Sequence, residues 1–136
     1  LAERLDDPQV AIADCRFSLM EPEAGAQQYA TEHIPGAVYF DLNRDLSSPV
    51  ETHGGRHPLP DIEALAHKLG LAGISAETHV VAYDDSCFAF AARLWWLLRY
   101  LGHSRREAWS LCEAAWTLLR PMLMDREACV PRIWFT

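Results

Sequence analysis

The chain has 136 residues, of which half are hydrophobic and five are Trp, and its formal net charge is −7. This length suits one domain with a buried core, and the apolar content is typical of a folded chain rather than a disordered one. The acidic balance argues against a nucleic-acid groove and against attraction to an anionic membrane surface, so we expect neither partner. No run approaches the roughly 18 apolar residues that span a bilayer.

The N-terminus and the cysteines together predict a cytoplasmic protein. The first ten residues, LAERLDDPQV, contain neither the basic segment nor the apolar segment of a signal peptide. The four cysteines form no C-x-x-C pair and no regular ladder of spacings, which fits a reducing compartment better than a disulfide framework. They are Cys15, Cys87, Cys112 and Cys129.

Short apolar runs alternate with helical patterns along the chain. After the helix-like residues 1–5, we predict strands at 10–17, 37–40 and 80–83, a loop with a short helix at 20–30, and helices at 60–69 and 88–101. Gly70 and Gly102 stand where these two longer helices would end in a left-handed cap. The alternation predicts an α/β fold with a mainly parallel central sheet flanked by helices on both faces, in which ligands bind at the carboxyl ends of the strands.

A long connector, residues 41–60, is rich in Ser, Pro, His and Gly. Loops of this length inside a domain usually belong to a functional surface or to a seam with another domain.

Residues 78–102, THVVAYDDSCFAFAARLWWLLRYLG, combine a strand, an acidic loop with one cysteine, and a helix. The unpaired N–H groups at such a helix start favour an anion and push a thiol toward thiolate. Cys87 forms a Cys-x5-Arg pattern with Arg93, as in loops that clamp an oxyanion. Such loops need small residues and Gly, which FAFAA lacks, so an inert and partly buried thiol is the alternative.

Four segments resemble the rhodanese-like sulfurtransferase family. YATEHIPGAVYF at 29–40 resembles its N-terminal signature, DCRF at 14–17 its first strand, GRHPLP at 55–60 its inter-strand loop, and FAARLWWLLRYLGH at 90–103 the helix after its active-site strand. The long loop and the double Trp are similar to the first, non-catalytic half of two-domain thiosulfate or 3-mercaptopyruvate sulfurtransferases. We expect one rhodanese-like domain over residues 1–136, with the resemblance covering 10–103. After His103 the chain departs from the family, and SRREAWSLCEAAWTLLRP reads as a helix instead of a strand.

The resemblance implies that the second half of such an enzyme carries a cysteine that accepts sulfur as a persulfide. Aligned by the strand 80–83, the position of that cysteine is Asp84 in this chain. A carboxylate cannot store sulfur as a persulfide, and at a helix start it would fill the anion site as an N-cap. We therefore expect Asp84 to plug the site and the domain to dock against a catalytic partner domain, in cis or as another protein.

Two alternatives remain open at this point. Cys87 could itself carry the persulfide, with Arg93, Asp85 and Ser86 around a small sulfur-containing anion, or the chain could be a non-catalytic protein-binding module. A phosphatase that uses Cys87 and Arg93 ranks last. Arg93 could instead form an ion pair with Asp84 or Asp85.

The remaining motif residues are interpreted as structural. Asp14 and Arg16 lie on one face of their strand and are expected to pair, although substrate binding is the alternative. The resemblance gives His33 a structural role beside the turn at Pro35 and Gly36. No ligand set has zinc spacing, so we predict no metal and no cofactor.

Overall fold

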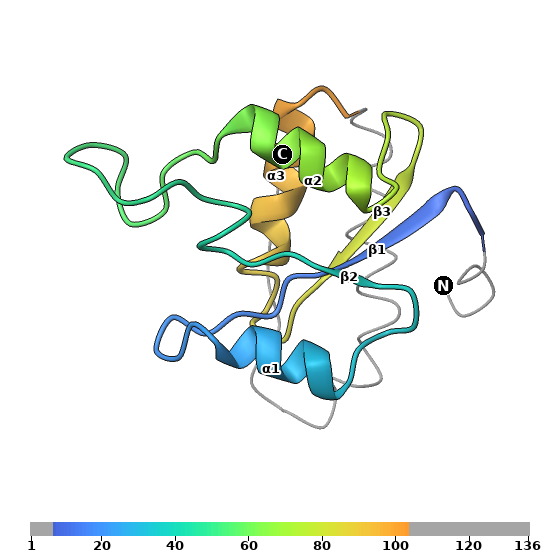
Figure 1. Ribbon diagram of the computed structural model, residues 1–136, viewed down its shortest axis with the longest axis horizontal. Helices are drawn as coiled ribbons and strands as arrows, with labels where there is room; N and C mark the ends of the chain where they lie inside the picture. Colours follow the sequence, from blue (N-terminus) through green and yellow to red (C-terminus); the bar gives the residue numbers. More distant parts are fainter. Residues whose placement is uncertain (1–6, 104–136) are drawn as a thin grey trace.

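The computed structural model describes residues 7–103 (Figure 1). Its elements follow the order β1 (Val10–Asp14), α1 (Ala24–Thr31), β2 (Val38–Tyr39), α2 (Ile62–Leu71), β3 (His79–Tyr83) and α3 (Ala91–Tyr100). The predictions for residues 1–5 and for the segment after His103 lie outside the described residues. No helix in the described range is long and apolar enough to cross a membrane.

The sheet is parallel, with the order β2-β1-β3, so β1 lies in its centre. The five residues of β1 pair in register with the five of β3, from Val10 opposite His79 to Asp14 opposite Tyr83. Both strands are mostly apolar, and Ala13, Val80 and Val81 are at most 2% exposed. Burial on both faces is what a parallel sheet requires, and the predicted α/β class is confirmed. The first strand ends at Asp14, three residues before the predicted end at Phe17.

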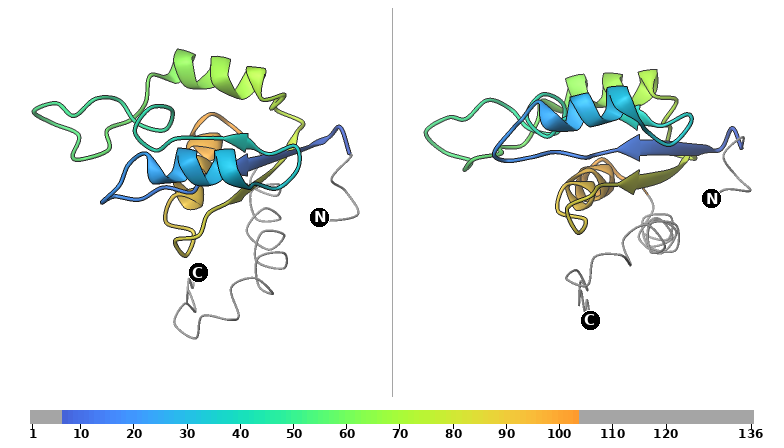
Figure 2. Two further views of the ribbon diagram at one scale, coloured as in Figure 1. Left: turned by 60° about the horizontal axis from the view of Figure 1, so that its bottom comes forward. Right: turned by 90° about the horizontal axis from the view of Figure 1, so that it is seen from below.

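Helices cover both faces of the sheet. The view along the sheet shows α1 and α2 on one side and α3 on the other (Figure 2). Helix α1 closely approaches the segment that follows β1 at Gly25, where an added Cβ would lie 2.0 Å from the carbonyl oxygen of Arg16. Only Gly allows this approach, because any side chain would collide with the backbone.

Helix α2 begins and ends two residues later than the predicted range 60–69. The carboxylate of Asp61 caps it by accepting from the Ala64 N–H at 2.8 Å. The prediction that Gly70 ends the helix was wrong. Gly73 takes the left-handed conformation (φ 73°), and the Ile74 N–H donates to the Leu69 oxygen in a Schellman closure. Gly70 fits inside the last turn because a helix tolerates Gly there at modest cost.

Helix α3 begins at Ala91 rather than at the predicted residue 88, because residues 84–90 form a separate loop. It ends as predicted, with Gly102 at φ 94° and the His103 N–H donating to the Leu98 oxygen. Trp95 packs against the core, whereas Trp96 is 43% exposed.

The connector between β2 and α2 protrudes from the body of the domain (Figure 1). Its first part is fixed by Asp41, which is 4% exposed and accepts from the N–H groups of Asn43 and Arg44 at 2.8 and 2.9 Å. Leu46 and Ser47 are buried, and residues 49–56 are exposed. The connector therefore consists of an anchored start and a free-standing loop.

Candidate functional site

Four backbone N–H groups converge on the carboxylate of Asp84, directly after β3. Ser86 and Phe88 donate to Oδ1 at 2.8 and 2.9 Å, and Phe90 and Ala91 donate to Oδ2 at 2.9 and 2.8 Å. Asp84 is only 3% exposed. Each carboxylate oxygen therefore has two donors, which is how a preformed anion site satisfies a bound oxyanion. We call this arrangement of residues 84–91 the Asp84 loop.

The Asp84 loop adopts this shape without any Gly. Cys87 and Phe88 both take positive φ angles, 55° and 64°. The left-handed conformation costs an L-residue on the order of 1–2 kcal/mol. Four hydrogen bonds to a charged acceptor contribute more, at about 1.5–3 kcal/mol each. FAFAA lacks the Gly of an oxyanion-binding loop around a cysteine, yet its N–H groups converge on Asp84, because the hydrogen bonds to the carboxylate offset the strain.

Asp84 acts at the start of α3 without being its N-cap. The N-cap position belongs to Phe90, whose side chain makes no capping hydrogen bond. The N–H groups of Phe90 and Ala91 are bound by Asp84 from the end of β3 instead. The positive end of the α3 dipole thereby faces a full negative charge.

The pKa of the buried Cys15 thiol is raised, first by burial and then by the charge of Asp84.

Cys87 lies at the outer tip of the Asp84 loop. It is exposed, and its sulfur is part of a disulfide in the structure. The four N–H groups that could stabilise an anion here are already bound to Asp84. Asp85 and Ser86 are at the same tip, where the Ser86 hydroxyl donates to Asp85 Oδ1 at 3.2 Å. The loop thus directs its donors at Asp84 and its other polar groups outward.

Arg93 contacts the connector rather than the Asp84 loop. Its Nε donates to the Leu46 oxygen at 3.2 Å, and its Nη2 donates to the oxygens of His57 and Pro58 at 3.1 and 2.9 Å. The ion pair with Asp84 or Asp85, which the sequence left open as an alternative, is not formed in the described part of the chain. The side chain points along α3 toward the connector, which the Cys-x5-Arg spacing alone did not reveal.

Asp14 and Arg16 form an ion pair at the end of β1. Asp14 is fully buried, its Oδ2 lies 2.6 Å from Arg16 Nη2, and its two oxygens accept from Arg16 Nε at 3.0 Å. The Tyr83 hydroxyl also donates to Asp14 Oδ2 at 2.6 Å. Burial and the Asp14 charge both raise the pKa of this phenol. The hydrogen bond between Tyr83 and Asp14 joins the carboxyl ends of β1 and β3. Tyr83 was not predicted as a partner of Asp14, although its place at the end of an otherwise aliphatic strand was the available signal.

His33 closes the end of α1. Its Nδ1 donates to the Tyr29 oxygen at 2.7 Å, and its ring stacks on that of Tyr29 with centroids 4.0 Å apart. Pro35 and Gly36 occupy the centre of a tight turn, with Gly36 at φ 79° and the Ala37 N–H donating to the Ile34 oxygen at 2.9 Å. These residues set the entry into β2 and touch no part of the Asp84 loop in any described contact.

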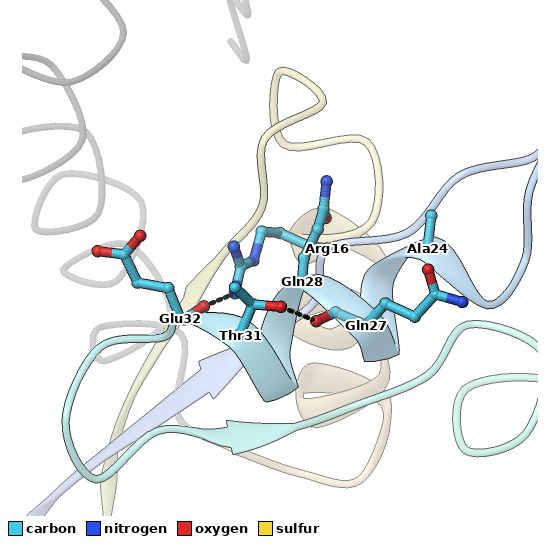
Figure 3. Close-up of a pocket in the computed structure, with 6 residues that line it drawn as sticks. All are labelled: Arg16, Ala24, Gln27, Gln28, Thr31 and Glu32. Carbon is cyan, nitrogen blue, oxygen red and sulfur yellow. Dashed lines mark hydrogen bonds between the residues drawn. The ribbon is translucent and has the colours of Figure 1, made fainter.

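A shallow pocket of about 330 Å³ lies on α1, separate from the Asp84 carboxylate (Figure 3). It is lined by Arg16, Ala24, Gln27, Gln28, Thr31 and Glu32. The Arg16 guanidinium also donates to the Glu32 carbonyl at 2.7 Å, while the Glu32 carboxylate points away from it (Figure 3). The positive charge in this pocket is already neutralised by Asp14.

No group of three or more His, Cys, Asp or Glu side chains within residues 7–103 could hold a metal ion.

Comparison with protein families matches residues 1–111 to the rhodanese-like domain. The chain belongs to the rhodanese family. Among curated relatives, this rhodanese-like domain is 53% identical over 103 residues to a probable 3-mercaptopyruvate sulfurtransferase of Pseudomonas aeruginosa, covering 75% of the chain and 36% of the relative. It is 35% identical over 100 residues to the thiosulfate sulfurtransferase of Bos taurus, covering 71% of the chain and 32% of the relative.

A solved structure agrees with the sequence relatives. The rhodanese-like domain superposes on 3-mercaptopyruvate sulfurtransferase from Leishmania major with a TM-score of 0.67 at 36% identity, covering 84% of this chain and 33% of that one. The chain spans about a third of the length of the relatives it matches. The matched part corresponds to the N-terminal domain of two-domain enzymes, which confirms the resemblance seen in the sequence.

Proposed function

We propose that this rhodanese-like domain is the non-catalytic half of a sulfurtransferase that moves sulfur from thiosulfate or 3-mercaptopyruvate to cyanide or a thiol. In this proposal its role is to dock against and shape a catalytic rhodanese-like domain, which binds the small sulfur-containing anion. The relatives' names support the reaction class, and their greater length supports the second domain.

One observation carries the non-catalytic assignment: the carboxylate of Asp84 fills the anion site. Sulfur transfer requires a thiolate that attacks the outer sulfur of thiosulfate. A new S–S bond to the enzyme then forms as the bond to the departing sulfite breaks. Asp84 offers only oxygen to such a donor, and its two oxygens are already bound by four backbone N–H groups. The cradle that would stabilise a persulfide is therefore permanently occupied.

Cys87 as a persulfide carrier is the competing proposal, supported by its exposed place on the same loop. It requires the disulfide to be reduced first. The N–H groups around it are bound to Asp84, so its thiolate would gain little from the start of α3.

Intact-mass measurement separates the two proposals. The reduced chain is incubated with thiosulfate and, in parallel, with 3-mercaptopyruvate, beside the matched variant Cys87→Ser. We expect no addition of a sulfur atom to either protein. Addition to the wild type that disappears in Cys87→Ser would replace our proposal with the carrier function.

A chimera tests the docking role. Residues 7–103 replace the matched region of the Pseudomonas aeruginosa relative, which is 53% identical to this chain over 103 residues. We expect the chimera to fold and to retain sulfur transfer from 3-mercaptopyruvate, since the second domain supplies the nucleophile. A folded chimera that has lost the activity would contradict the docking role, provided that the parent relative is active under the same conditions.

A further inference from the structure

One guanidinium holds both ends of the protruding loop. Arg93 binds the Leu46 oxygen through Nε and the oxygens of His57 and Pro58 through Nη2. These carbonyls lie on either side of residues 47–56, so the contacts close the neck of that loop. We call residues 47–56 the connector loop. A single side chain that joins the two ends of a loop removes much of the freedom the loop would otherwise have.

The neck is a partly desolvated environment. Leu46 is fully buried and Ser47 is 6% exposed, whereas the loop beyond them is open to solvent. Burial lowers the pKa of Arg93, and its guanidinium also lies 5.8 Å from the centroid of the Trp96 ring. Hydrogen bonds from a charged donor to carbonyls are stronger here than at a fully exposed site. Removing the guanidinium would also leave three carbonyl oxygens short of a donor.

Arg93 is attached to the same helix turn that Asp84 holds. The Phe90 and Ala91 N–H groups bind Asp84 Oδ2, and Arg93 follows two residues later in the first turn of α3. The Arg93 N–H itself donates to the Phe90 oxygen at 3.1 Å. The backbone that carries the guanidinium is thus positioned by the carboxylate.

We propose that Arg93 is a positioning residue that fixes the connector loop on α3, and that Asp84 acts on this loop through the first turn of that helix. The Asp84 loop and the connector loop, far apart in sequence, are then coupled. A change that loosens the Asp84 loop therefore also loosens the connector loop. The proposal concerns this domain by itself and does not depend on which reaction the full protein catalyses.

Trypsin provides a residue-specific measurement of the coupling. Arg56 is exposed in the connector loop and directly precedes His57, whose carbonyl Arg93 binds, so opening of the neck should make cleavage after Arg56 faster. The variants are Arg93→Gln and Arg93→Lys, with Arg99→Gln as the matched control. Arg99 lies on the same helix and stacks 5.1 Å from the Trp95 ring, but it makes no described contact with the connector. Mass spectrometry follows the fragment that ends at Arg56.

We expect Arg93→Gln to speed cleavage at Arg56 about tenfold or more, the factor that corresponds to roughly 1.4 kcal/mol. Arg93→Lys should give an intermediate rate, because an ammonium can bind one or two of the three carbonyls. Arg99→Gln should cleave at the wild-type rate. Equal acceleration in Arg93→Gln and Arg99→Gln would overturn the proposal.

Two further measurements distinguish positioning from general destabilisation. The faster cleavage in Arg93→Gln should depend only weakly on urea, as expected for local opening, since global unfolding exposes far more surface. A urea dependence as steep as that of global unfolding would refute the positioning role. Asp84→Asn should also speed cleavage at Arg56 with weak urea dependence. An unchanged rate at Arg56 in folded Asp84→Asn would disprove the coupling to Asp84.

Discussion

Replacing Asp84 by Ala tests whether the domain depends on its internal anion. The substitution leaves four N–H donors facing a small, mostly buried space. Four lost bonds of about 1.5–3 kcal/mol each set the upper limit. Relaxation of the two left-handed residues, Cys87 and Phe88, and entry of water return part of that amount. We therefore expect a loss of about 3–5 kcal/mol, a large share of the stability of an ordinary domain.

The assay is urea unfolding of the wild type, Asp84→Ala and Asp84→Asn, followed by far-UV circular dichroism. Asp84→Asn keeps the shape but turns an NH2 group toward two N–H donors, so we expect an intermediate loss of about 2–3 kcal/mol. Asp85→Ala is the matched control. Asp85 is exposed and, within residues 7–103, its carboxylate accepts only from the Ser86 hydroxyl, so its replacement should change stability by less than about 0.5 kcal/mol.

Added formate makes the same assay a test of the cradle. In Asp84→Ala, formate can enter the space left by the carboxylate, and at ten times its dissociation constant it restores about 1.4 kcal/mol. Chloride at the same ionic strength should restore much less, because it cannot accept from both pairs of donors. A loss below about 1 kcal/mol in Asp84→Ala would refute the reasoning, since so small a loss is typical of an ordinary substitution. A loss equal to that of Asp85→Ala would do so as well.

Three further outcomes follow from the geometry. Gly25→Ala should destabilise the domain by about 3 kcal/mol or more in urea unfolding, because the added Cβ would collide with backbone atoms. Gly70→Ala should stabilise the domain by about 0.5–1 kcal/mol, because the space around Gly70 is open. The opposite order of stabilities would contradict the close approach of α1. Burial and then Arg56 lower the pKa of His57 from its ordinary 6.5, so its contribution to stability is complete above that pH and declines as the pH falls below it. NMR titration should show the low pKa and its rise in Arg56→Gln. Cys15 should resist iodoacetamide in the native state because burial and the Asp84 charge raise its pKa, and labelling as fast as in urea would contradict this.

The strands and helices could be predicted because their patterns are local. The apolar runs at 10–14 and 79–83 and the glycine after α3 carry their own signals. The end of α2 was misjudged because Gly70 and Gly73 are both suitable caps, and only the packing of Ile74, which is buried, selects the later one.

The residue at the centre of the candidate site could be predicted from the sequence, but the arrangement of the N–H groups around it could not. The sequence placed a carboxylate at the start of α3. It did not show that the N–H groups of Ser86, Phe88, Phe90 and Ala91 turn toward it, since this depends on two residues in a conformation that single-sequence preferences disfavour. The role of Arg93 was missed for a different reason. Its acceptors are carbonyls 35 to 47 residues away, and no local spacing encodes such contacts.

The central place of β1 has a consequence for the order in which this chain can fold. Asp14 and Tyr83 are 69 residues apart, so the first strand must wait for the third before the sheet can close. At a synthesis rate of about 5–20 residues per second, this interval lasts roughly 3–14 s on the ribosome. During that time an apolar strand lacks its main partner, and an unpaired strand is a template for aggregation. We therefore expect chaperones that bind nascent chains to recognise residues 10–14.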